Sequence, residues 1–229
     1  MFNLSQITNR SPTGKLVLSQ PMIQVYIHLC LALVTSSIVS FFVGNSATLM
    51  NLLVDDITKW AVALSPIVML FAIVPLFRTS KSPIVIFTML HTYAALMGLS
   101  MSSLFAGYNL PAVVTAFMGM SILFVCISGY ALVTDRDLTG IGAYIIPALI
   151  GLIIVIILNM LLGNALPDTV ISLLSIVVFI IIIASDTQAA RDILTDDPTT
   201  VNIAFATLTL YLSTINIFFR FFNINKPRD

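Results

Sequence analysis

Charged residues are scarce in this sequence of 229 residues: they make up only 9%, whereas hydrophobic residues make up 59%. A soluble domain carries roughly 25% charged residues, because its surface must face water. So few charges cannot cover a globule in water, which excludes a cytosolic enzyme, a nucleic-acid-binding protein and a disordered regulator. The sequence therefore predicts an integral membrane protein whose main partner is the lipid bilayer.

Glutamate is absent, and all ten acidic residues are Asp, balanced by ten Lys and Arg residues. The chain therefore has no net charge with which to attract polyanions. Cysteine is also scarce, and both Cys30 and Cys126 lie in apolar runs. We expect them to act as small hydrophobic side chains rather than as a disulfide or a metal-binding pair. No cofactor is predicted.

Seven apolar stretches are long enough to cross about 30 Å of hydrocarbon, which takes about 20 helical residues. They cover residues 24–43, 60–77, 82–105, 110–133, 141–162, 169–190 and 201–222. Helices are favoured over strands because lipid offers no partner for open backbone groups. The sequence thus predicts an all-α bundle of seven transmembrane helices with short loops. It has an N-terminal tail (1–23), one transmembrane domain (24–222) and a C-terminal tail (223–229).

The Lys and Arg residues predict the orientation, because cytoplasmic loops carry an excess of them. With the N-terminus inside, six lie on the cytoplasmic side and four on the opposite side. The N-terminus is therefore predicted to be cytoplasmic and the C-terminus periplasmic. The basic C-terminal end would also fit a re-entrant last helix that keeps this tail inside.

Small residues recur every four positions on two predicted helices, and such ridges let helix backbones approach closely. They are Ala94, Gly98, Ser102 and Ala106 on the third helix, and Ser36, Ser40 and Gly44 at the end of the first. We expect these faces to pack helices within one chain. The alternative is the seam of a homo-oligomer.

Asp186 is the one acidic residue within a predicted span, and an ionisable group at membrane depth is a candidate functional site. Its own helix offers no cation at the third or fourth following position. A partner must therefore come from another helix, and Arg78 ends the second helix at comparable depth. The alternative is that Asp186 reaches interfacial water as an ordinary residue near a helix end.

Two histidines and several neutral polar residues also lie in the spans. For His28 and His91, interhelical hydrogen bonding is favoured over metal binding, because no carboxylate or Cys lies at ligand spacing. The neutral residues are expected to join helices by hydrogen bonds, with an ion pathway as the alternative. They are Asn159, Tyr211, Ser213, Thr214 and Asn216.

Catalytic patterns are weak in this sequence. The nearest approach to a serine protease motif is Gly119-Met120-Ser121, which lacks a closing glycine. A serine nucleophile also needs a positioned base. An aspartyl intramembrane protease needs two opposed acids, and the predicted helices offer one. We therefore do not expect an enzyme.

Two motifs stand out in the last two predicted helices: the sixth helix ends with Asp186-Thr187-Gln188, and the seventh contains Leu-Tyr-Leu-Ser-Thr-Ile-Asn-Ile-Phe at 210–218. These motifs resemble those of the transmembrane Bax inhibitor motif, or Bax inhibitor-1, family. Family members have an Asp-Thr-Gln end and a Leu-Tyr-Leu-Asp-x-Ile-Asn-Leu-Phe seventh helix. Lys81-Ser82-Pro83 and the Gly-Tyr-Ala-Leu-Val-Thr run at 129–134 fit as well, so the resemblance covers the whole chain.

The resemblance implies an ion- and pH-sensing site. The family's bacterial calcium-leak members use a pair of acids, one on each of the last two helices, as a latch that a basic residue on the second helix can join. By position, the first acid is Asp186 and the basic partner is Arg78, whereas Ser213 stands in place of the second acid. If Asp186 bound calcium as a transported ion, Tyr211, Ser213 and Asn216 could add neutral oxygens.

Ser213, followed by Asn216-Ile217-Phe218 and a short tail, is similar to the YccA-like bacterial branch of that family. This likeness implies a substrate-like inhibitor of the inner-membrane protease FtsH, which would grip the polar N-terminal tail. The first prediction is therefore a modulator of FtsH in the bacterial inner membrane. The alternative is a pH-sensitive calcium or cation leak in which the second acid of the latch is missing.

Overall fold

The computed structural model describes residues 19–224 except residues 55, 81, 108–109 and 163–166. The described part of the chain is helical and contains no strand. The elements are α1 (Gln20–Gly44), α2 (Ala47–Val54), α3 (Asp56–Thr79), α4 (Pro83–Gly107), α5 (Leu110–Val133), the short 3₁₀ turn η2 (Thr139–Ile141), α6 (Gly142–Leu161), α7 (Asp168–Asp196) and α8 (Thr200–Ile224). The prediction of an all-α membrane protein is confirmed.

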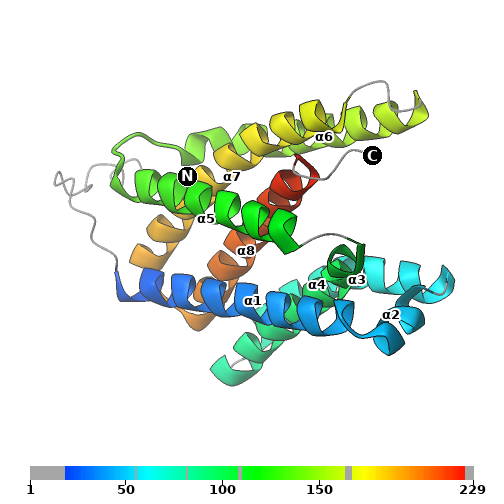
Figure 1. The fold of residues 1–229 in the computed structure, drawn as a ribbon. Helices are drawn as coiled ribbons and strands as arrows, with labels where there is room; N and C mark the ends of the chain where they lie inside the picture. The colour runs from blue at the N-terminus through cyan, green and yellow to red at the C-terminus, as the bar shows by residue number, and fades with distance from the viewer. Residues whose placement is uncertain (1–18, 55, 81, 108–109, 163–166, 225–229) are drawn as a thin grey trace.

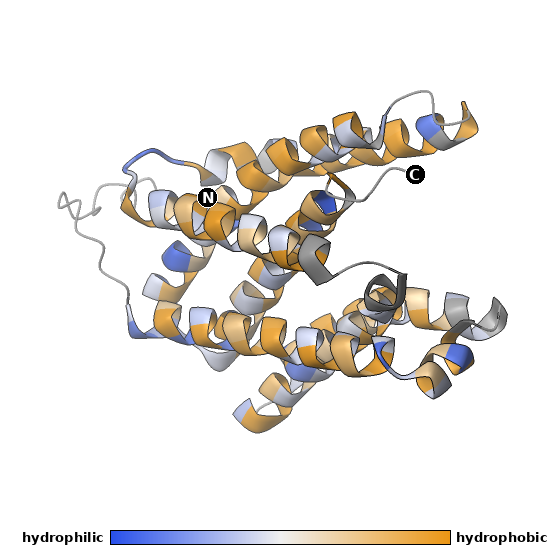
Figure 2. Cartoon of the chain, in the orientation of Figure 1, coloured by the Kyte–Doolittle hydropathy of each residue, from blue (hydrophilic) through white to orange (hydrophobic). Residues whose placement is uncertain are grey.

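Six of the described helices are long and apolar enough to cross a membrane, namely α1, α3, α4, α5, α7 and α8. The described part of α6 adds a shorter apolar stretch, Tyr144–Asn159. Large hydrophobic side chains point outward along these helices; Phe71 and Ile84, for example, are each 78% exposed. Figure 2 shows the apolar colour along most of α1, α5 and α6. Such an exterior suits a hydrocarbon solvent.

The helix boundaries follow local sequence. Pro21 lies in the first turn of α1 and Pro83 begins α4, where a missing N–H leaves no hydrogen bond unmade. Helix α7 ends just before Pro198, which disfavours helical backbone in the preceding residue. Three helices extend by four or more residues past the predicted apolar spans: α1 begins at Gln20 rather than at 24, α3 begins at Asp56 rather than at 60, and α7 continues to Asp196 rather than ending at 190. The short helix α2 was not predicted.

Helix α8 lies between two groups of helices and contacts both (Figure 1). On one side α1 packs on α4, and α4 packs on α3. On the other side α5 and α6 pack on α7. Helix α8 is the most buried of the six spans, and its buried residues include polar ones: Thr207, Tyr211, Ser213 and Thr214. The polar interior of the bundle therefore centres on the last helix.

The small-residue faces pack against each other inside the chain. A Cβ atom added to Gly98 on α4 would overlap the backbone of Ser36 on α1. The Ser36 hydroxyl donates a hydrogen bond to the carbonyl oxygen of Ala94, 2.9 Å away. The contact between α1 and α4 thus depends on the absence of a side chain at Gly98.

Candidate functional site

The carboxylate of Asp186 on α7 meets the hydroxyl of Ser213 on α8. The Ser213 hydroxyl donates a hydrogen bond to Asp186 Oδ2 over 3.2 Å. Ser213 is buried and Asp186 is half-buried. The next charged residue on α7 is Arg191, five residues later and therefore ~8 Å away along the helix axis at ~1.5 Å per residue. The structure therefore brings together two of the predicted site residues within the bundle.

Arg78 does not form an ion pair with Asp186. It lies exposed in the last turn of α3, and its guanidinium carbon is 5.9 Å from the centre of the Phe205 ring on α8. Phe205 precedes Ser213 by eight residues, which separates them by ~12 Å along α8. Comparable depth on two helices did not bring these side chains together, because α3 packs mainly on α4.

Tyr211 and Asn216 serve other contacts. The Tyr211 hydroxyl lies 2.5 Å from Ser36 Oγ on α1, and its ring packs edge-on against Tyr93. The single Ser36 proton goes to a backbone carbonyl, so Tyr211 is the donor in this pair. The Asn216 side chain donates to the Leu212 carbonyl oxygen of its own helix. Neither residue bonds to Asp186.

The three residues Asp186-Thr187-Gln188 bind three different parts of the bundle. Successive residues of a helix point in directions about 100° apart, so a short run can reach several neighbours. Asp186 reaches α8, and Thr187 donates to Ser128 Oγ on α5 over 3.3 Å. Gln188 reaches the turn between α5 and α6. The run therefore holds α7 against its neighbours.

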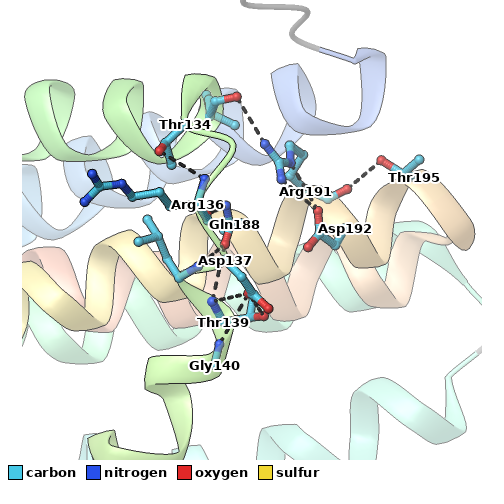
Figure 3. A network of polar contacts seen from close by, with 11 residues as sticks. Thr134, Arg136, Asp137, Thr139, Gly140, Gln188, Arg191, Asp192 and Thr195 are labelled. Atoms are coloured by element: carbon cyan, nitrogen blue, oxygen red, sulfur yellow. Dashed lines mark hydrogen bonds and ion pairs between the residues drawn. The ribbon is translucent and has the colours of Figure 1, made fainter. Parts of the chain in front are cut away.

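Gln188 binds this turn through both ends of its amide group (Figure 3). Its Oε1 accepts from the backbone N–H groups of Leu138 and Thr139, and its Nε2 donates to the Arg136 carbonyl oxygen. Gln188 is fully buried, so these bonds replace water for the side chain and for the turn. The sequence did not predict this role, because no pattern in it links Gln188 to a turn fifty residues earlier.

Arg191, one turn further along α7, ties the same region together. Its guanidinium donates to the Leu132 carbonyl oxygen at the end of α5 and pairs with Asp192 at 3.1 Å (Figure 3). The side chain of Asp192 is 44% exposed, and the residue lies within the last turns of α7.

Comparison with known proteins decides the family. The sequence profile described as "Inhibitor of apoptosis-promoting Bax1" matches residues 18–228, almost the whole chain. The chain belongs to the Bax inhibitor-1 family. The resemblance found in the two motifs is thereby confirmed.

Several bacterial proteins resemble this Bax inhibitor-1 family member. The inner membrane protein YbhL of Escherichia coli K12 is 30% identical over 204 residues, which cover 86% of this chain and 87% of YbhL. An uncharacterized protein of Deinococcus radiodurans is 33% identical over 144 residues, or 60% of this chain and 61% of that protein. Uncharacterized protein RP147 of Rickettsia prowazekii is 37% identical over 130 residues, 55% of each chain.

The two histidines of this Bax inhibitor-1 family protein lie side by side. His28 on α1 and His91 on α4 have ring centroids 5.7 Å apart, and His28 stacks on Phe87 at 3.8 Å. Both Nδ1 atoms are buried and make no hydrogen bond with the described residues. Within the described ranges, no three His, Cys, Asp or Glu side chains gather as a group that could hold a metal ion.

Proposed function

We propose that this protein is a cation leak of the inner membrane, in which Asp186 and Ser213 form the site that a permeating cation meets. The carrying observation is the hydrogen bond between these two side chains inside the bundle. The described residues place no Lys, Arg or His in an ion pair with Asp186. A carboxylate at membrane depth without a countercharge is costly, and a passing cation or a proton relieves that cost. The inner-membrane location is inferred from the similarity to YbhL, an inner membrane protein.

A weak site suits a leak. Calcium takes six to eight oxygen ligands, of which one carboxylate and one hydroxyl supply only a few. Water would fill the remaining positions, so the ion would be held briefly and released. Conduction requires binding that is favourable enough for entry and weak enough for exit. The Asp186–Ser213 pair meets this requirement better than a closed cage of acids would.

Replacing Asp186 by Asn should reduce calcium flux about tenfold or more, because the negative charge that attracts the ion is removed. The measurement is calcium entry into liposomes that contain the purified protein and an internal calcium indicator. Asp196→Asn is the matched control, since Asp196 is exposed at the end of α7 and the change is chemically identical. Equal flux in wild type and Asp186→Asn would contradict the proposal.

A second variant in the same assay tests the partner residue. Ser213→Asp would place two carboxylates within about 3 Å of each other, and such a pair shares a proton instead of carrying two charges. We expect flux that depends on pH in this variant. Ser213→Asn, which adds a similar side chain without charge, should not gain this dependence. If both variants behave alike, Ser213 is not part of the ion site.

A second candidate function is modulation of the membrane protease FtsH. It rests on the YccA-like Ser213 and on the described part of the chain, which consists almost wholly of packed helices. A bundle of this kind offers a protease little to pull on except a tail. The predicted tail covers residues 1–23, and its residues 1–18 lie outside the part of the chain that the structure describes. We propose that this tail lies in the cytoplasm.

Deleting residues 1–18 tests this second function. The deletion leaves all of α1 in place, so the bundle should fold and insert as before. If FtsH grips the tail, the shortened protein should no longer slow the degradation of a second membrane substrate by purified FtsH. Unchanged inhibition by the shortened protein would rule out modulation through the tail, while the flux assay remains independent of it.

A further inference from the structure

A lateral cleft runs between α1 and α5. These two helices do not pack closely on each other, because α1 packs on α4 and α8, whereas α5 packs on α7 and α8 (Figure 1). The cleft has a volume of about 890 Å³. Its floor includes Thr214, Ile215 and Phe218 of α8. It is separate from the Asp186–Ser213 pair, neither of which lines it.

The cleft opens into the hydrocarbon region. Its edges include Val34 and Ile38 on α1 and Phe117 and Val125 on α5, which are between 44% and 67% exposed. All four lie within helices that are long and apolar enough to cross a membrane. Whatever fills the cleft therefore enters sideways from the bilayer, and its surface there is apolar.

The two ends of the cleft differ. At one end the Tyr26 hydroxyl on α1 lies 2.6 Å from Ser128 Oγ on α5, and the Tyr26 ring packs edge-on against Phe124. These contacts close the cleft, and the two hydroxyls satisfy each other. At the other end lies Ser40, which is 1% exposed and whose hydroxyl has no hydrogen-bond partner among the described residues. A buried hydroxyl without a partner is unfavourable, so this end lacks an acceptor.

We propose that the cleft binds a membrane phospholipid, with one acyl chain lying along α1 and an ester carbonyl accepting a hydrogen bond from Ser40. Tyr26 and Ser40 are ~21 Å apart along the helix at ~1.5 Å per residue. This length is about two-thirds of the ~30 Å hydrocarbon thickness, so it suits an extended lipid chain. Ser40 lies one turn from the end of α1 at Gly44, which is the depth of a lipid's ester groups rather than of its chain ends.

A helix from another protein or a second copy of the chain fits the cleft less well. Helices that associate in membranes meet through small residues, which let the backbones approach. The edges of the cleft carry the bulky side chains Val34, Ile38 and Phe117 beside smaller ones such as Ser37, so another helix could not approach closely along its whole length. The small-residue face at Gly98 is already used inside the chain against Ser36. An acyl chain is narrower and needs no flat surface.

The proposal is tested with a photoreactive lipid. The full-length protein is reconstituted in vesicles of phosphatidylethanolamine and phosphatidylglycerol that include phosphatidylethanolamine with a diazirine in one acyl chain. Light-induced adducts are then located by mass spectrometry. We expect adducts on the cleft residues Leu33 and Ser121, which are half-buried, to match or exceed those on outward-facing Ile153 and Leu173. Adducts confined to the outward-facing residues would mean that only bulk lipid surrounds the protein.

Two variants separate filling of the cleft from loss of the fold. Ser37→Phe adds a ring at an exposed position that lines the cleft, and should reduce cleft adducts severalfold without changing those on Ile153. Thr92→Phe is the matched control, because Thr92 is also exposed and also bonds to the carbonyl four residues earlier. If both variants lower the cleft adducts equally, the proposal fails.

The role of Ser40 has its own measurement. Ser40→Ala removes the unpartnered hydroxyl and should leave helix packing intact, while native mass spectrometry should show severalfold less phospholipid retained per protein after mild detergent extraction. Retention equal to wild type would refute the ester contact. With a photoreactive amino acid in place of Phe117, protein–protein cross-links without lipid adducts would instead assign the cleft to a helix and overturn the lipid proposal.

Discussion

Replacing Tyr211 by alanine is expected to lower the free energy of unfolding by about 3–5 kcal/mol, as for other large aromatic side chains removed from a close-packed interior. Tyr211 is fully buried on α8, and it contacts Ser36 on α1 and Tyr93 on α4. Its removal leaves a cavity where α8 meets one of the two helix groups. The measurement is unfolding of the purified protein in mixed micelles with increasing dodecyl sulfate.

Two further variants serve as controls for the loss of stability expected in Tyr211→Ala. Tyr211→Phe keeps the ring and loses only the hydroxyl, so the expected loss is about 1 kcal/mol. Tyr144→Ala removes a tyrosine that is 72% exposed on α6, and its effect should stay within about 0.5 kcal/mol. A loss at Tyr211 no larger than that at Tyr144 would show that α8 is not held by this side chain.

Gly98→Ala is expected to destabilise the protein by about 3 kcal/mol, because inserting one methyl group into a full interface forces the backbones apart. The new Cβ would overlap the backbone of Ser36, which cannot rotate away as a flexible side chain could. Separation of α1 from α4 would also break the bond from Ser36 to Ala94. Thermal unfolding in detergent, followed by circular dichroism, measures the change.

The same substitution at Gly151 is the control. Gly151 lies within α6, and a Cβ there meets nothing within 4 Å. In a helix interior alanine is favoured over glycine by roughly 1 kcal/mol. Gly151→Ala should therefore leave stability unchanged or raise it slightly. If both substitutions destabilised the protein equally, the close approach of Gly98 to the Ser36 backbone would not be the cause of the destabilisation.

Much of the fold could be predicted from the sequence because the bilayer imposes a length on each span. The apolar runs from Trp60 to Phe77 and from Leu110 to Val133 closely match the cores of α3 and α5. Helix α2 was missed because it has only eight residues, too few to cross hydrocarbon. The end of α7 was predicted too early, since Asp192 and Asp196 resemble a loop in composition although the helix continues into the polar region.

The candidate site was predictable only in part. The resemblance aligned Asp186 with Ser213, and their contact is direct. The pairing of Arg78 with Asp186 failed because similar depth on two helices says nothing about which faces meet. The roles of Ser128 and Tyr26 were not foreseen, since hydroxyl groups in apolar helices give no indication of their partners until the helices are packed.

The central place of α8 has a consequence for biosynthesis. A ribosome delivers the seven earlier helices before this one, yet most of the contact between the two helix groups runs through α8, with smaller direct contacts such as that of Tyr26 on α1 with Ser128 on α5. Helix α8 also has the lowest hydropathy of the six spans, so it inserts into the bilayer least readily on its own. Its insertion is favoured most by contacts with helices that are already in the membrane. Insertion of α8 is thus the step that completes the packing of the bundle. A nascent chain stalled before residue 200 would hold its two helix groups together only weakly, and quality-control proteases could attack it until α8 is synthesised.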